Sequence, residues 1–209
     1  MWIAIGFALI LYRIGLHKQI GNRILEPWAH MNTLITSSRW NNFYALRIHP
    51  DAQPEIRKLA EEIKAAIEAA PVQILKRNEW HLPFIRPSEL ERLDNVFHPN
   101  GGVSINVLKR ISTARCARVS YLTHDGRETT FEEDRKLADR LIGSTPLHAS
   151  PAEHQCTPDW YDQKDAMLSR HAGDGKNLSW QPEWENPHLH GNLPGWIQHR
   201  KQLKGEYVS

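Results

Sequence analysis

The strongest pattern of apolar positions along the chain lies in residues 54–70. Apolar side chains recur there at intervals of three and four residues, which is the period of an amphipathic helix. The stripe consists of Ile56, Leu59, Ala60, Ile63 and Ile67. Pro54 suits the first turn of such a helix, and Pro71 ends it. The sequence therefore predicts a helix over residues 54–70.

Weaker apolar patterns predict two helices before this one. Residues 16–25 repeat an apolar position every four residues as far as Pro27, whose ring ends the pattern. Residues 38–48 form the second candidate, because the serine pair at 37–38 can cap its start and Pro50 stops it. We expect both segments to be helical.

Two further helices are predicted in the second half of the chain. Residues 104–121 carry apolar positions at helical spacing. Residues 130–142 are better defined, because Thr130 and Glu133 have the spacing of a capping box. Gly143 suits the end of this helix.

The remaining segments depart from these regular patterns. Residues 2–12 form an uncharged apolar run, which Arg13 interrupts well before the roughly 20 residues that a membrane span needs. The run lacks the basic region and the cleavage site of a secretory signal, so we expect a buried helix. Its abrupt start suggests a start codon partway into a longer ancestral protein.

We expect loops within 71–103 and irregular, surface-lying structure from about residue 171 onward, where Gly, Asn, Pro and Trp are frequent.

Composition favours a folded protein and excludes few functions. The 209 residues suit one domain or two small ones, and 40% hydrophobic with 24% charged residues is typical of a packed core. A formal net charge of +2 does not argue for nucleic acid, and 12 histidines make the charge sensitive to mild acid. Two cysteines, Cys116 and Cys156, make no disulfide framework and are expected to be reduced thiols of a cytoplasmic protein.

The densest group of polar side chains is the segment His148–His154, which holds two imidazoles, a hydroxyl and a carboxylate. Such a turn offers donors and acceptors to a polar ring system. His148, His154 and Cys156 are also metal-ligand types, but no CxxC or HExxH spacing supports a zinc site, and no metal is expected. By its spacing alone, the segment is more typical of a polar surface turn than of a ligand site.

Two helical segments place charged or nucleophilic groups beside apolar ones. Arg39, Asn42 and Arg47 lie on one side of the helix predicted at 38–48, where they could hold an anionic or heterocyclic ligand or simply be solvated. Cys116 stands between two arginines, which could lower its pKa. Because no His–carboxylate pair is near in sequence, we interpret Cys116 as a small buried thiol.

The tail segment Trp196–Lys201 mixes aromatic and basic residues. This mixture could bind phosphate or nucleic acid, or the tail could pack one Trp and solvate the rest. The chain has no GxGxxG, no phosphate-cradling Gly-rich loop and no GxSxG elbow.

Four short elements together resemble flavin-dependent thymidylate synthases. Residues 117–121 resemble the family's ARVSY element, and residues 148–154 resemble its H-x-S-P-F-E-H flavin-binding element. Residues 23–27 resemble its AR-x-x-LP helix. Residues 42–47 together with 52–56 resemble its NF-x-x-LR…AQ-x-EI segment. Ala152 stands where the family usually has Phe. Each element is short, but the four together make a specific signal over roughly residues 15–155.

The chain departs from the family in two respects. In the family's usual order the ARVSY and SPFEH elements precede the NF-x-x-LR helix, but here they follow it. The order in this chain resembles the permuted arrangement of phage-like relatives. Circular permutation is plausible where the two termini of a protein lie close together. The R-H-R signature with its following Ser and Arg, which binds flavin and the dUMP phosphate in the family, is absent and should lie upstream of residue 1. Residues 196–200 echo it only in part.

The resemblance implies methylation of dUMP to dTMP, with methylenetetrahydrofolate as the one-carbon donor, FAD as cofactor and NADPH as its reductant. Arg47 would contact the pyrimidine and favour its N3-ionised form as the catalytic group, and Arg23 would assist dUMP binding. The flavin would lie along a set of polar side chains: Asn42, Ser120, His148, Ser150 and Glu153. Because the phosphate-binding signature is missing, this chain alone is expected to be weakly active or inactive.

The resemblance also implies an α+β fold with helices packed on a mixed sheet. We expect a single domain over 1–209, incomplete relative to the family, with a dUMP and flavin segment at 15–70, a flavin segment at 104–155 and an irregular tail at 171–209. The family forms homotetramers, so we expect self-association, and we expect neither membrane nor nucleic-acid partners. The alternatives are a non-catalytic remnant that binds nucleotide or flavin, and a small nucleic-acid-binding protein that uses the tail.

Overall fold

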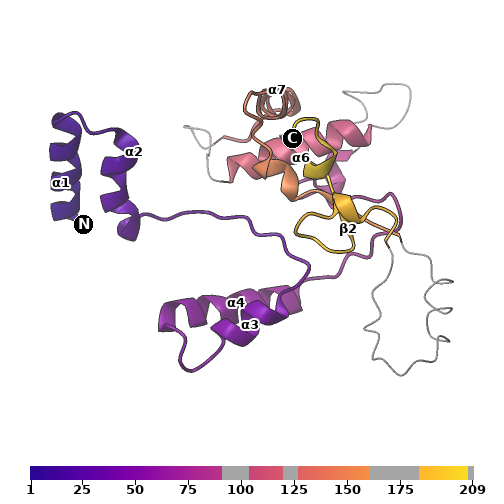
Figure 1. Ribbon diagram of the computed structural model, residues 1–209, viewed down its shortest axis with the longest axis horizontal. Coiled ribbons are helices and arrows are strands. Elements are labelled where there is room, and N and C mark those ends of the chain that lie inside the picture. The colour runs from indigo at the N-terminus through magenta and orange to yellow at the C-terminus, as the bar shows by residue number, and fades with distance from the viewer. Residues whose placement is uncertain (91–103, 120–126, 161–183, 207–209) are drawn as a thin grey trace. The chain divides into compact units, whose positions relative to one another are not determined.

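The computed structural model describes residues 1–90, 104–119, 127–160 and 184–206. The chain divides into two compact units, Met1–Leu34 and Ile35–Ser209. The described part is rich in helices and contains a small two-stranded sheet, a combination that is α+β in the general sense (Figure 1). Among the described residues, no helix combines the length and the apolar character needed to cross a membrane.

The first unit consists of three short helices. Helix α1 spans Trp2–Arg13, α2 spans Lys18–Gly21, and the 3-10 helix η1 spans Asn22–Trp28. The helix expected near the N-terminus is confirmed, but its expected burial is not seen within this unit. Trp2 and Ile3 are each 79% exposed, because α1 packs against α2 and η1 on one side only.

The helix predicted for residues 16–25 is split, and proline does not end it. Pro27 lies inside η1, which continues to Trp28. The tighter 3-10 turn closes behind the proline, where the Ala29 amide donates to the Glu26 carbonyl over 3.1 Å. The prediction that Pro27 is a boundary was therefore wrong by one turn.

Helices α3 and α4 begin the second unit and pack against each other as a helical hairpin. Helix α3 spans Asn41–Arg47, and α4 spans Pro54–Ala69 with its proline in the first turn, as predicted. The serine cap expected for α3 was wrong. The helix begins too far along the chain for Ser37, whose hydroxyl instead accepts from the Arg39 amide over 3.1 Å.

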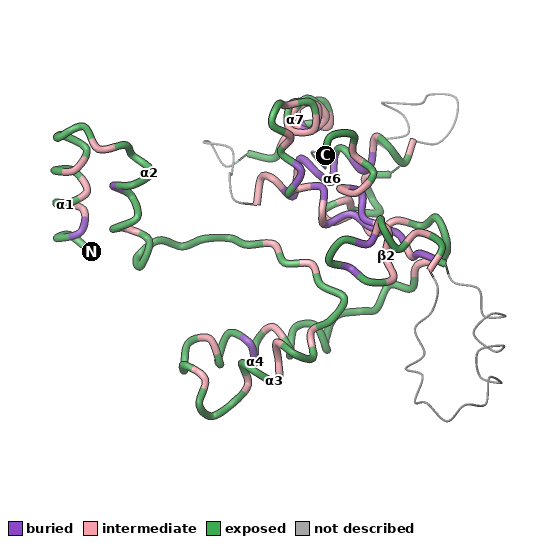
Figure 2. The backbone as a smooth tube through the Cα atoms, in the orientation of Figure 1, coloured by how far each residue is buried: buried purple, intermediate pink, exposed green. Residues whose placement is uncertain are grey.

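Helices α6 and α7 form the centre of the second unit, where they pack against each other. Helix α6 spans Ile105–Arg118 and α7 spans Phe131–Ile142. Buried residues run along α6, and Ile111 and Ala114 are fully enclosed (Figure 2). The capping box of α7 is confirmed, since Thr130 accepts from the Glu133 amide while Glu133 accepts from the Thr130 amide.

Short elements follow α7 and complete this core. The 3-10 helix η2 spans Ser150–Glu153, strand β1 spans Cys156–Pro158, the 3-10 helix η4 spans Pro187–Leu189, strand β2 spans Trp196–Gln198, and the 3-10 helix η5 spans Arg200–Gln202. Strands β1 and β2 are antiparallel, with Thr157 opposite Ile197. This pairing brings the C-terminal segment onto the helices.

The described part of the tail is therefore not a surface-lying segment, contrary to expectation. Leu193 is 2% exposed, and Gln198 is 1% exposed where β2 pairs with β1. The part of the predicted tail at 171–183 lies outside the described residues.

A buried Asp–His pair holds the tail in place. The ring nitrogen Nε2 of His190 lies 2.7 Å from the carboxylate of Asp159, which also accepts from the Asn186 amide over 2.9 Å. The other ring nitrogen of His190 accepts from the Gly195 amide over 3.1 Å. Both nitrogens are thus used within the fold, which indicates a structural role for this histidine.

Candidate functional site

The turn His148–His154 packs its small residues on α6 and leaves two of its polar side chains, His148 and Ser150, outside. Ala149 and Ala152 are buried, whereas His148 and Ser150 are exposed. Pro151 in the first turn starts the 3-10 helix η2, which contacts α6. The two predicted flavin contacts, His148 and Ser150, are therefore open to a ligand.

Glu153 is held by an arginine from the far end of the chain. Its carboxylate accepts from Nη1 of Arg200 over 2.9 Å, and Nε of Arg200 donates to Glu206 over 2.9 Å. Burial opposes the charge of Arg200, but its hydrogen bonds with Glu206 and Glu153 raise its pKa. About a third of each of the Arg200 and Glu153 side chains is exposed, at 35% and 30%, so both remain within reach of a bound molecule.

Gln155 ties this site to the core. Its amide group is fully buried between Ser112 and Thr113 of α6, at 3.1 and 3.3 Å. Its backbone carbonyl accepts from the amide of His199 over 2.9 Å. Buried amides are stable only when their hydrogen bonds are satisfied, so this residue sets the positions of η2 and η5 relative to α6.

His154 faces the segment that leads to α3. Its Nδ1 lies 3.0 Å from the hydroxyl of Thr36, and burial lowers the pKa of the ring. His154 is therefore neutral near pH 7 and acts here as a hydrogen-bonding partner. Within the described residues, no group of three or more His, Cys, Asp and Glu side chains could hold a metal ion.

The other residues implied by the resemblance lie on other segments of the chain. Asn42 and Arg47 lie exposed on α3, and no hydrogen bond or ion pair in the described part of the chain links them to η2. Arg23 lies exposed on η1 in the other unit. Ser120 lies outside the described residues.

A second buried group of residues lies beside η5. Nζ of Lys109 stands 4.4 Å from the ring centre of Trp80 and donates to Gln202 over 3.3 Å. Burial lowers the pKa of Lys109. Burial also lowers the pKa of His199 to about 4, with Lys109 acting in the same direction and Gln202 opposing. Among the described residues, neither ring nitrogen of His199 has a well-aligned hydrogen-bond partner.

Cys116 is buried, as predicted, and unsuited to nucleophilic attack. Burial raises the pKa of its thiol to about 12, and the Gln155 amide group lies 3.3 Å from the sulfur. A thiol with this pKa is protonated at neutral pH and is a poor nucleophile.

Replacing Cys116 with alanine is therefore expected to leave any dUMP methylation within a few-fold of the parent activity. The measurement is dTMP formation, with circular dichroism as the check of folding. Complete loss of turnover in a variant with an unchanged spectrum would instead indicate a thiol mechanism.

Sequence reasoning missed the partners that shape the site. Arg200 lies in the segment that echoes the family signature, and that weak echo was the one available signal. Nothing in the pattern marks Gln155, Glu206 or Lys109, because their roles come from burial against segments distant in sequence. A comparison of the chain with protein-family models, with curated proteins and with solved structures found no match.

Proposed function

We propose that this chain is a cytoplasmic flavin-dependent thymidylate synthase, which methylates dUMP to dTMP. The observation that carries the proposal is the ion pair between Glu153 and Arg200. It joins the segment that resembles the family's flavin-binding element to the segment that echoes its arginine signature. Helix α6, which ends in the ARVSY-like residues, supports both through Gln155.

The exposed groups of the turn His148–His154 suit FAD in their chemistry. The hydroxyl of Ser150 and the imidazole of His148 can each donate or accept a hydrogen bond, as the edge of an isoalloxazine ring requires. The guanidinium of Arg200, on a side chain that is about a third exposed, suits an anionic group of the same cofactor. Bound FAD would supply the hydride that completes the methyl group, with NADPH as the reductant and methylenetetrahydrofolate as the carbon donor.

Arg47 and Arg23 would act on the nucleotide substrate. A guanidinium placed beside the pyrimidine favours its N3-ionised form, because an opposite charge lowers the pKa of the ring nitrogen. Both side chains are exposed in the described structure and open to a ligand. The same proposal includes two further features that the resemblance implies. They are a homotetramer with sites shared between subunits and a complete mixed sheet.

The proposal is tested by FAD retention. The double variant Ser150→Ala/Glu153→Ala removes one hydroxyl and one carboxylate that would line the flavin, and we expect it to weaken FAD binding about thirtyfold, since each of the two lost hydrogen bonds contributes roughly 1 kcal/mol. The measurement is flavin absorbance after gel filtration, followed by a fluorescence titration. The matched control, Ser38→Ala/Glu62→Ala, changes the same residue types at exposed positions outside η2. Equal retention by both variants, or no FAD binding by the parent, would refute the flavin site.

A second candidate function is flavin or nucleotide binding without turnover. It is favoured by one observation: among the described residues, no hydrogen bond or ion pair joins Arg47 of α3 to η2. Production of dTMP from dUMP, methylenetetrahydrofolate, FAD and NADPH separates the two. Under the enzyme proposal Arg47→Ala abolishes turnover and spares FAD binding, whereas a binding protein shows no turnover in the parent.

A further inference from the structure

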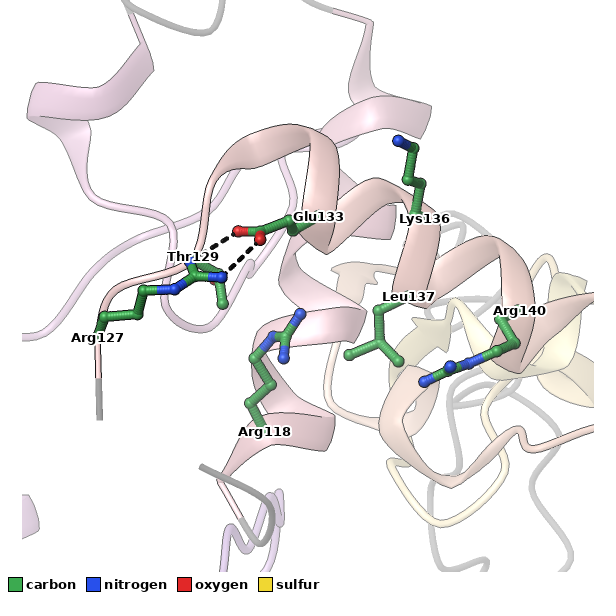
Figure 3. A pocket seen from close by; sticks show the side chains of 7 residues that line it. All are labelled: Arg118, Arg127, Thr129, Glu133, Lys136, Leu137 and Arg140. Carbon is green, nitrogen blue, oxygen red and sulfur yellow. Dashed lines mark hydrogen bonds and ion pairs between the residues drawn. The ribbon is translucent and has the colours of Figure 1, made fainter. Parts of the chain in front are cut away.

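A basic pocket lies away from η2, where the C-terminal end of α6 meets α7. Its volume is about 420 Å³, which is within the size range of small-molecule sites. The lining comes from both helices and from the segment before α7: Arg118, Arg127, Thr129, Glu133, Lys136, Leu137 and Arg140. Figure 3 shows Arg118 rising from α6 while Leu137 and Arg140 extend from α7.

The carboxylates in and behind this pocket are already used. Glu133 accepts from both terminal nitrogens of Arg127, over 2.7 and 3.0 Å, and also caps α7 (Figure 3). Asp134, fully buried behind the pocket, accepts from Arg118 over 3.2 Å and from Thr129 over 2.7 Å. Of the four cationic side chains that line the pocket, Arg127 is therefore paired with Glu133 and Arg118 with Asp134, which leaves the two cations on α7 to be considered.

The cations on α7 retain capacity for an anion. Lys136 lies 3.8 Å from Glu132, which is held more closely by Arg135 at 2.8 Å. Arg140 is exposed and has no recorded hydrogen-bond or ion-pair partner within the described residues. The apolar side chain of Leu137, between these two cations in sequence, gives the pocket one wall that can contact an uncharged part of a ligand.

We propose that this pocket binds the diphosphate group of a small nucleotide. Guanidinium groups match phosphate oxygens in geometry, and two linked phosphates supply enough negative charge for the excess of cations. The lining is confined to one hollow rather than an extended basic stripe, and the net charge of the chain is only +2, which favours a small anion over a nucleic-acid backbone. Apart from Arg118, which belongs to the ARVSY-like element, none of these residues is used in the thymidylate synthase proposal.

The test is calorimetric titration of the full chain with inorganic pyrophosphate at low salt. The double variant Arg140→Gln/Lys136→Gln is expected to weaken pyrophosphate binding about tenfold, since each exposed cation contributes up to roughly 1 kcal/mol. The matched control, Arg57→Gln/Lys58→Gln, removes the same number of charges from exposed ion pairs of α4, at positions that do not line the pocket. The control should bind pyrophosphate as the parent does.

Three outcomes would overturn the assignment. They are absence of pyrophosphate binding by the parent, equal weakening in the pocket and control variants, and tighter binding of a ten-residue thymidine oligonucleotide that the pocket variant loses. The last result would assign the pocket to a nucleic-acid backbone. Because the readout is pyrophosphate affinity, failure here leaves the FAD test unaffected.

Discussion

Replacing Asp134 with alanine is expected to destabilise the second unit by about 3–5 kcal/mol, the usual effect of breaking a buried ion pair. Asp134 is fully enclosed between α6 and α7 and accepts from Nε of Arg115 over 3.0 Å and from Nε of Arg118 over 3.2 Å. Its removal leaves two guanidinium groups short of a carboxylate, and Arg115 is only 16% exposed. The measurement is the free energy of urea unfolding, followed by circular dichroism.

The matched control for this prediction is Glu132→Ala, two residues earlier on the same helix. Glu132 also pairs with an arginine, over 2.8 Å, but its side chain is 47% exposed. An exposed pair contributes roughly 0–1 kcal/mol, so this variant should unfold almost as the parent does. If both variants lose a similar amount of unfolding free energy, burial does not set the strength of the Asp134 contacts.

Lowering the pH from 7 to 5 is expected to destabilise the protein, with His199 contributing about 2 kcal/mol of the loss. Burial lowers the pKa of His199 to about 4 in the folded protein, whereas the ordinary value is 6.5. Between these two values the unfolded chain binds a proton that the folded chain does not. Stability is therefore fully present above pH 6.5 and falls as the pH approaches 4.

The variant His199→Leu isolates this contribution. It has no titrating ring, and because the ring nitrogens of His199 lack well-aligned partners, an apolar replacement should cost little stability at pH 7. The difference in urea unfolding free energy between pH 7 and pH 5 should shrink by about 2 kcal/mol. Burial also lowers the pKa values of His81 and His154, so these two residues account for the pH dependence of stability that remains in the variant. The exposed control His188→Leu should keep the pH dependence of the parent, and an unchanged slope in His199→Leu would contradict the prediction.

Helices whose signals are local were predicted well from the sequence. The stripe over 54–70 and its proline gave α4 to within one residue at its end. The pair Thr130 and Glu133 gave the start of α7 and its capping box, because a cap depends on residues three positions apart. Pro27 misled the prediction, since a proline excludes an α-helical continuation but not a 3-10 turn.

The sequence by itself also determined which side chains of η2 are available to a ligand. Small residues at 149 and 152 alternate with polar ones, so packing the former on α6 leaves His148 and Ser150 outside. The composition of the tail, by contrast, predicted an irregular surface segment. Antiparallel pairing with β1 decided that Gln198 is buried, and strand pairing over such a separation leaves no periodic signal in strands of three residues.

Only the tertiary structure joined Glu153 to Arg200, which lies 47 residues further along the chain, and Lys109 to Gln202, 93 residues away. The same holds for the pocket, whose cations belong to α6, to α7 and to the segment between them. Helices and caps follow from interactions between near neighbours, so the sequence determines them. The pKa of His199, the anchoring of Gln155 and the free charge of the pocket depend on which distant segments exclude water from them, and that is decided by packing.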